Sequence, residues 1–166
     1  MAYGTTALFR DKYGADYTVR LLASLEEGAS RDVADLDKLI AGTPPSGADE
    51  EALQRGLDRL TEVIDSKSDL VDSYLRQAAT LPLDAAVLAA SPIVEFTLDI
   101  VRFYMTTAPT MRTGVVEDDY TIALAWFRDV AKGIVVLEKP DGVETPVTPA
   151  VGSKTIVYTD TLMGKM

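Results

Sequence analysis

Two groups of closely spaced carboxylates are the first candidates for chemistry in this 166-residue chain. The segment DVADLDK at 32–38 carries the oxygen ligands that calcium prefers. It lacks the turn glycine and the distal bidentate glutamate of an EF-hand loop, so we expect no metal there. Glu117, Asp118 and Asp119 form the second group, and the start of a helix accounts for them, because the helix dipole favours negative charge at its N-terminus. The sequence therefore predicts no metal site.

Residues suited to acid–base or nucleophilic catalysis are scarce. The chain contains no histidine and no cysteine, which removes the usual general base near neutral pH, the thiolate nucleophile and the commonest metal ligands. The sequence has no P-loop, no G-x-G-x-x-G and no G-x-S-x-G motif. A serine or threonine nucleophile would need a lysine as its base, and the few lysines have the pattern of surface residues. We therefore expect no cofactor and no enzymatic activity.

The net charge of −10 is concentrated between residues 24 and 79, where six basic and thirteen acidic residues give −7. An acidic surface repels phosphate, which disfavours a direct grip on DNA or RNA. Three interpretations stay open: solubility alone, a DNA mimic that occupies a nucleic-acid-binding protein, or a surface past which DNA slides without sticking. No apolar run approaches the roughly 18 residues of a membrane span, and the N-terminus lacks the regions of a signal peptide. We therefore expect no membrane partner and synthesis in the cytoplasm.

One long helix is the strongest predicted element, and it spans about residues 50–78. Asp49 is its expected N-cap. Its apolar residues keep a spacing of four, three, four, seven and four: Leu53, Leu57, Leu60, Ile64, Val71 and Leu75. The opposite face is charged, so the helix is predicted to pack along one side of a small bundle.

Shorter helices are expected before the long one. They span 5–13, a stretch beginning at Asp16, and a stretch near 33–41. The last lies within an irregular polar loop over 24–48, which contains several glycines and a Pro-Pro pair. Together with the remaining helices they form a predicted helical domain over 1–137.

Two further helices complete a fold that we predict to be a small, mainly α-helical bundle. One spans 92–105, with Ser91 as its cap and Pro92 at the first helical position. It is apolar on nearly every face, so we expect it to be surrounded, either by its own domain or by neighbouring subunits. The other spans 118–132, with Asp118 as its cap.

The composition changes near the C-terminal end. Ile134–Leu137 and Thr155–Thr159 are predicted to form short strands, and 138–166 is predicted to be an extended β-strand arm. The second run alternates two faces, with Thr155, Val157 and Thr159 on one side and Ile156 and Tyr158 on the other. This run either packs at home as an ordinary strand or adds an edge strand to a partner's sheet.

A second apolar stripe on the long helix contains Val63, Leu70 and Tyr74. Two apolar faces on one helix suggest that one packs at home and the other against a neighbouring subunit. Pro82 is expected to stop this helix and to turn the chain. The candidate subunit-interface residues are Leu70, Tyr74, Leu81, Leu83, Phe96 and Phe103.

Four segments in a fixed order resemble a known family: RDKYG, DSYLRQAATLPL, VEFTLDIVRFYM and YTIALAWFRDVAKGIVVL. Over 3–23 and 49–137 the chain is similar to the Mu-like phage neck proteins, the head–tail adaptor family related to the connector proteins of other long-tailed phages. The shared motifs are packing motifs, so the resemblance rests on their combination. The loop at 24–48 is longer and more irregular than the family pattern.

The resemblance implies a structural virion protein that is made in the bacterial host cytoplasm and located in the virion neck. It implies a homo-oligomeric, dodecameric ring docked beneath the portal protein, where the ring extends the DNA channel and joins the capsid to the tail. DNA would pass without specific binding, and a tail-completion or stopper protein would bind the ring. The arm residues 155–159 would then bind the portal. An acidic DNA-mimic inhibitor stays open as the alternative function.

Overall fold

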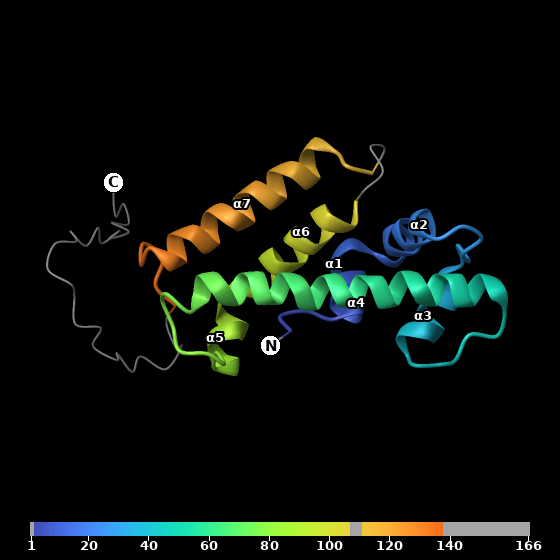
Figure 1. The fold of residues 1–166 in the computed structure, drawn as a ribbon, viewed down its shortest axis with the longest axis horizontal. Coiled ribbons are helices and arrows are strands. Elements are labelled where there is room, and N and C mark those ends of the chain that lie inside the picture. Colours follow the sequence, from blue (N-terminus) through green and yellow to red (C-terminus); the bar gives the residue numbers. More distant parts are fainter. Residues whose placement is uncertain (1, 107–110, 138–166) are drawn as a thin grey trace, which may run out of the picture.

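The computed structural model describes residues 2–106 and 111–137, and these residues form seven helices and no strand (Figure 1). In chain order the helices are α1 (Thr6–Tyr13), α2 (Ala15–Leu25), α3 (Val33–Ile40), α4 (Ala48–Leu75), α5 (Ala85–Ala90), α6 (Ile93–Met105) and α7 (Gly114–Ala131). In Figure 1, α4 runs along the molecule with α6 and α7 above it and α3 and α5 below it. The predicted helical bundle built on one long helix is confirmed.

The long helix α4 carries the predicted apolar stripe, and all six stripe positions are buried. The predicted N-cap is wrong, because Gly47 occupies the N-cap and Asp49 lies in the first turn. Gly47 has no side chain to cap the helix, and Glu50 instead ties the first turn to the residue before the cap. Its carboxylate accepts hydrogen bonds from the Ser46 backbone N–H at 2.7 Å and from the Ser46 hydroxyl at 2.9 Å.

The C-terminal end of α4 is Leu75, so Pro82 does not stop the helix as predicted. The backbone N–H groups of Ala78 and Ala79 both donate to the Leu75 carbonyl, at 2.9 and 2.8 Å, and the chain leaves the helix axis there. The short helix α5 follows and was not predicted, because six residues are too few to show an apolar period. The Asp84 carboxylate caps it by accepting from the Ala86 N–H at 3.0 Å.

Two hydrophobic cores lie along α4. The first core contains Phe9, Val19, Leu21, Leu22, Leu36, Leu39, Leu53, Leu57, Leu60, Ile64, Leu98, Val101 and Met105. The second core contains Tyr3, Val71, Leu75, Leu83, Ile93, Ile100, Ala123, Phe127 and Val130. Both α4 and α6 contribute to each core, so these two helices join the halves of the molecule.

The apolar helix α6 is surrounded within its own chain. Leu98 faces the first core and Ile93 the second, so of the two open possibilities the domain itself covers this helix. The predicted cap is wrong here too. Pro92 occupies the N-cap, and the Ser91 hydroxyl donates to the Leu88 carbonyl at 3.5 Å.

The last helix, α7, begins at Gly114, four residues before the predicted cap. Thr113 is its N-cap, because the Thr113 carbonyl accepts from the N–H groups of Val116 and Glu117 at 3.0 and 3.3 Å. Asp118 therefore lies inside the helix, and its prediction as the cap is wrong. Gly133, with φ at +70°, follows the helix as predicted.

The segment before α1 is held against the C-terminal third of α4. The Tyr3 N–H donates to Ser68 Oγ at 2.9 Å, and the Tyr3 hydroxyl donates to Asp72. Tyr3 is 3% exposed, and burial followed by the hydrogen bond to Asp72 raises the pKa of its hydroxyl. This contact explains why a serine interrupts the apolar stripe of α4. Next to it, a Cβ on Gly4 would lie 2.8 Å from Leu98 Cδ2, so any other residue there would require the Leu98 side chain to shift.

The segment Ile134–Leu137 is not a strand, and that prediction is wrong. Its side chains nonetheless alternate between covered and exposed positions. Val135 and Leu137 pack on the second core, while Ile134 and Val136 are 68% and 67% exposed. The β-branched pattern reflects this half-buried path, because the residues that the structure describes provide no neighbouring strand with which to pair. The predicted strand Thr155–Thr159 and the predicted arm at 138–166 lie outside the described residues.

Candidate interaction surface

The six predicted interface residues lie in three different settings. Leu70 and Tyr74 are half-buried on one flank of α4. Leu83 is buried in the second core, and Leu81 packs against that core from the connection between α4 and α5. The remaining two, Phe96 and Phe103, lie on α6 and are partly covered by α7.

Aromatic side chains dominate the contact between α6 and α7. The rings of Phe103 and Tyr120 stack with their centroids 3.9 Å apart and their planes 10° apart. Tyr104 meets Tyr120 edge-on at 6.0 Å and is 42% exposed. The contact between α6 and α7 thus leaves Tyr104 exposed and Tyr120 partly exposed, and each of them has an apolar ring and a polar hydroxyl.

A flank of α4 continues this aromatic region. Tyr74 stacks on Phe127 at 6.3 Å, and Lys67 Nζ lies 3.8 Å from the centre of the Tyr104 ring. Burial, followed by the hydrogen bond with Tyr104, raises the pKa of the Tyr120 hydroxyl, and the nearby Arg128 charge opposes that rise. We call the resulting area the tyrosine surface, and it consists of Lys67, Leu70, Tyr74, Tyr104, Tyr120 and Arg128.

A different flank of α7 carries exposed apolar residues. Residues spaced three and four apart share one side of a helix, and here they form what we call the outer stripe: Val115, Asp118, Ile122, Ala125 and Asp129. Val115 and Ile122 are 61% and 57% exposed. The sequence prediction missed this stripe because Val115 and its neighbours were assigned to a loop. The three-four spacing was the signal that could have found it.

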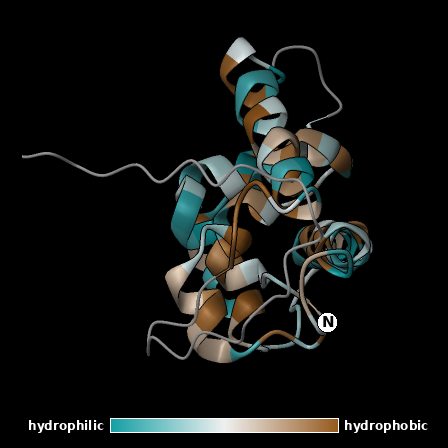
Figure 2. Ribbon diagram, turned by 90° about the vertical axis from the view of Figure 1, so that its left-hand side faces the viewer, coloured by the Kyte–Doolittle hydropathy of each residue, from teal (hydrophilic) through white to brown (hydrophobic). Residues whose placement is uncertain are grey.

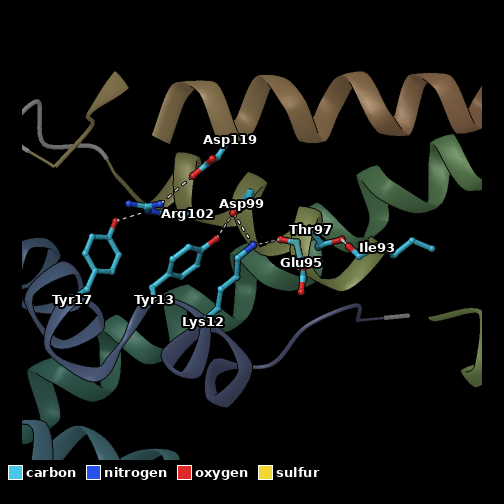
Figure 3. Close-up of polar contacts among 9 residues, drawn as sticks. All are labelled: Lys12, Tyr13, Tyr17, Ile93, Glu95, Thr97, Asp99, Arg102 and Asp119. Carbon is cyan, nitrogen blue, oxygen red and sulfur yellow. Dashed lines mark hydrogen bonds and ion pairs between the residues drawn. The ribbon is translucent and has the colours of Figure 1, made fainter. Parts of the chain in front are cut away.

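A cluster of charged and tyrosine side chains joins α6 to α1 and α2 (Figure 3). Asp99 accepts from Lys12 Nζ at 2.8 Å and from the Tyr13 hydroxyl at 2.7 Å, and Lys12 also donates to the Glu95 carbonyl at 2.7 Å. Asp99 is 8% exposed, so its charge depends on these partners. Burial, then the hydrogen bond to Asp99, raises the pKa of the Tyr13 hydroxyl.

Arg102 extends the same cluster to α7. Its Nε donates to the Tyr17 hydroxyl at 3.2 Å, and its Nη1 donates to Asp119 Oδ2 at 3.4 Å. The guanidinium also lies over the rings of Tyr13 and Tyr17, at 4.8 and 5.0 Å. The two carboxylates of this cluster, Asp99 and Asp119, each have a cationic partner (Figure 3). The cluster therefore fixes how the helices pack, and it presents no free nucleophile or base.

A family model described as "Bacteriophage Mu, Gp36" matches residues 5–155. The match spans most of the chain and decides its family. The chain belongs to the bacteriophage Mu Gp36 family. The resemblance to a Mu-like phage protein is thereby confirmed. No curated protein and no solved structure gives a significant match.

The seven helices that the structure describes in this Gp36-family chain lie within the matched residues, and so do the tyrosine surface and the outer stripe. Residues 155–159, the predicted binding arm, extend past the end of the match. The match therefore covers both surfaces described above and only the first residue of that run.

The family member also carries an acidic ridge on α4, formed by Asp58, Glu62, Asp65 and Asp69. Figure 2 looks along α4 and shows this helix at one edge of the molecule, so one side of it faces solvent. None of the four carboxylates forms an ion pair with another of the residues that the structure describes. Asp58 accepts a hydrogen bond from the Gln54 amide at 2.8 Å. The ridge keeps its negative charge open to solvent.

Neither a metal centre nor a membrane span emerges from the described parts of this chain. Across 2–106 and 111–137, no three carboxylates gather as a metal ion would require. Among the helices there, none is long and apolar enough to cross a membrane.

Proposed function

We propose that this Gp36-family chain is a structural virion protein that forms a head–tail adaptor ring in the phage neck. In this role the ring docks beneath the portal, extends the DNA channel and offers its other side to a tail-completion or stopper protein. The dodecameric ring implied by the resemblance is part of the proposal. We propose no catalytic activity.

The distribution of exposed apolar side chains carries the proposal. In the described residues six large apolar side chains are exposed, namely Leu8, Tyr104, Val115, Ile122, Ile134 and Val136. Five of them lie between residues 104 and 136, in the part of the chain built by α6, α7 and the segment after α7. Exposed apolar groups concentrated on one part of a protein mark a contact surface. In a phage family, a subunit covered by neighbours fits that distribution.

The acidic ridge of α4 supports the channel part of the proposal. These four carboxylates, which pair with no cation among the described residues, repel DNA phosphates, so DNA could slide past such a surface without binding. We propose that this ridge faces the lumen of the ring. The predicted arm at 155–159 is proposed to bind the portal.

Two measurements test the adaptor function. Purified particles of the encoding phage should contain the protein, and removal of its gene should leave filled heads and tails that do not join, as seen by electron microscopy. Native mass spectrometry should be run on the full chain alone and on the full chain mixed with portal. A ring should appear in both samples, or in the sample with portal only. A protein absent from particles, or one that never joins a portal ring, would contradict the proposal.

The acidic ridge also favours a second candidate, a DNA mimic that inhibits a nucleic-acid-binding protein. Such a protein should be a monomer or dimer and should compete with DNA for its target. The two functions separate on the Asp58→Asn, Glu62→Gln, Asp65→Asn, Asp69→Asn variant. A mimic should lose its target, whereas an adaptor should still assemble and should retain DNA more strongly in the channel.

A further inference from the structure

The tyrosine surface and the outer stripe lie on two flanks of the same helix. On the side of the outer stripe, Trp126 packs against Phe96 at 5.4 Å and Asp119 binds Arg102. On the other side, Tyr120 lies against Tyr104. The two surfaces therefore face different directions from α7, and one molecule cannot bring its own pair into contact.

The chemistry of the two surfaces is complementary. The outer stripe offers two branched apolar side chains, one alanine and two aspartates. The tyrosine surface offers three tyrosines, Leu70 and two cations, Lys67 and Arg128. Tyrosine and arginine are enriched where proteins bind one another, because each supplies a large contact area with a polar end. The two aspartates that flank Ile122 and Ala125 match a lysine and an arginine around a tyrosine patch.

We propose that the outer stripe of one copy docks onto the tyrosine surface of the next copy. The occupant of each surface is thus a second copy of this chain, selected by the opposite charges and the apolar centres. Because the two surfaces differ, the contact is head to tail, and each added copy leaves one free surface of each kind. Such a contact repeats until it closes into a ring. The inference rests on the proposed ring, and it names the residues that build it.

Engineered cysteine pairs test this contact directly, since the natural chain contains no cysteine. In the full-length variant with Leu70→Cys and Ile122→Cys, each copy can link to the next one. Oxidation of purified particles of the encoding phage should give a ladder of covalent oligomers on a non-reducing gel. The longest rung should report the number of copies in the ring. The matched control combines Ile122→Cys with Asp65→Cys, which places the first thiol on the acidic ridge, and it should give no ladder.

Charge exchange provides a second test. The variant Asp118→Lys, Asp129→Lys and the variant Lys67→Glu, Arg128→Glu each place like charges across the contact. In the cysteine-pair background each should reduce cross-linking by about tenfold. Combining all four changes should restore the ladder, because opposite charges then meet again. All four positions lie outside both cores, so thermal melting followed by circular dichroism should be nearly unchanged.

Failure of this contact and failure of the adaptor function give different results. Protein that is present in particles but forms no ladder, or the same ladder as the control, overturns the contact and leaves the adaptor function standing. Protein that is absent from particles overturns the adaptor function, and the cysteine pair is then oxidised in the purified full-length chain. A ladder there supports the contact, and its absence overturns it. A ladder unaffected by charge exchange overturns the pairing of these two surfaces.

Discussion

The two hydrophobic cores share α4 and α6 but differ in what covers them. The first core is closed by α1, α2 and α3, and the cluster around Asp99 and Arg102 ties its edge together with hydrogen bonds and ion pairs. The second core is covered by α7, the Tyr3 segment and the path through 134–137. Five of the six large apolar side chains that are exposed in the described residues lie on α6, α7 and the segment after α7. The first core is thus closed by helices and polar contacts, whereas α7, which covers the second core, leaves apolar side chains exposed on its outer side.

Truncating the largest buried ring of each core should have the largest effect. Phe9 and Phe127 are each fully buried, so Phe9→Ala and Phe127→Ala should each lower the free energy of unfolding by about 3–5 kcal/mol. Because α4 and α6 belong to both cores, urea denaturation of either variant should still show one transition. Two separated transitions would mean that the halves are independent.

Removing the acid at the centre of the polar cluster should have the next largest effect. Asp99→Ala leaves the Tyr13 hydroxyl without its acceptor and removes the ion pair of Lys12, which keeps the Glu95 carbonyl, and it should cost about 1–3 kcal/mol. Urea denaturation measures this cost, and Asp99→Asn, which still accepts from Tyr13, is the matched control. If the two variants are equally stable, the hydrogen bond from Tyr13 contributes nothing measurable beyond the ion pair with Lys12, which both variants lose.

Alkaline pH should weaken both halves through Tyr3 and Tyr13. The folded protein raises the pKa of both hydroxyls above the usual 10.0. The stability that they supply is therefore present below pH 10 and is lost as the pH rises, because the unfolded chain then releases protons that the folded chain retains. Above pH 10, the raised pKa of each tyrosine should lower the free energy of unfolding by up to about 1.4 kcal/mol per pH unit. In urea denaturation, Tyr3→Phe and Tyr13→Phe should each reduce this slope. A slope unchanged in both variants would contradict the prediction.

Truncation at the surface should affect folding least and assembly most. Tyr74 is half-buried and stacks on Phe127, so Tyr74→Ala should lower the free energy of unfolding by about 1 kcal/mol while it prevents incorporation into particles. Thermal melting and the protein content of particles measure the two effects. Tyr74→Phe, which keeps the ring, should behave like the natural chain in both. If Tyr74→Ala unfolds the isolated subunit, this side chain is simply part of the core.

The apolar stripe of α4 could be predicted because spacing along one helix is a local property. The ends of the helices were harder to place. Asp49 has the chemistry of a cap, yet Glu50 reaches Ser46 and lets the helix begin earlier. Pro82 can end a helix, but the turn after Leu75 ends this one first.

Contacts between distant parts of the sequence could not be predicted. Ser68 interrupts the α4 stripe for the sake of Tyr3, which lies 65 residues away. Asp99 and Arg102 lie on a helix that the sequence shows to be apolar on nearly every face, and their partners on α1, α2 and α7 depend on the fold. The second stripe of α4 was recognised at Leu70 and Tyr74, whereas the tyrosines that complete the tyrosine surface come from α6 and α7.

The Tyr3 contact also has a consequence for synthesis of the chain on the ribosome. Tyr3 leaves the ribosome well before its partners Ser68 and Asp72, which are 65 and 69 residues further along. Its hydrogen bonds can form only after most of α4 has been translated. Helices α1 and α2 can fold and pair while the chain is still growing, but the segment that precedes them stays free until α4 emerges. The segment around Tyr3 is therefore translated before α1 and α2 but reaches its final place after them.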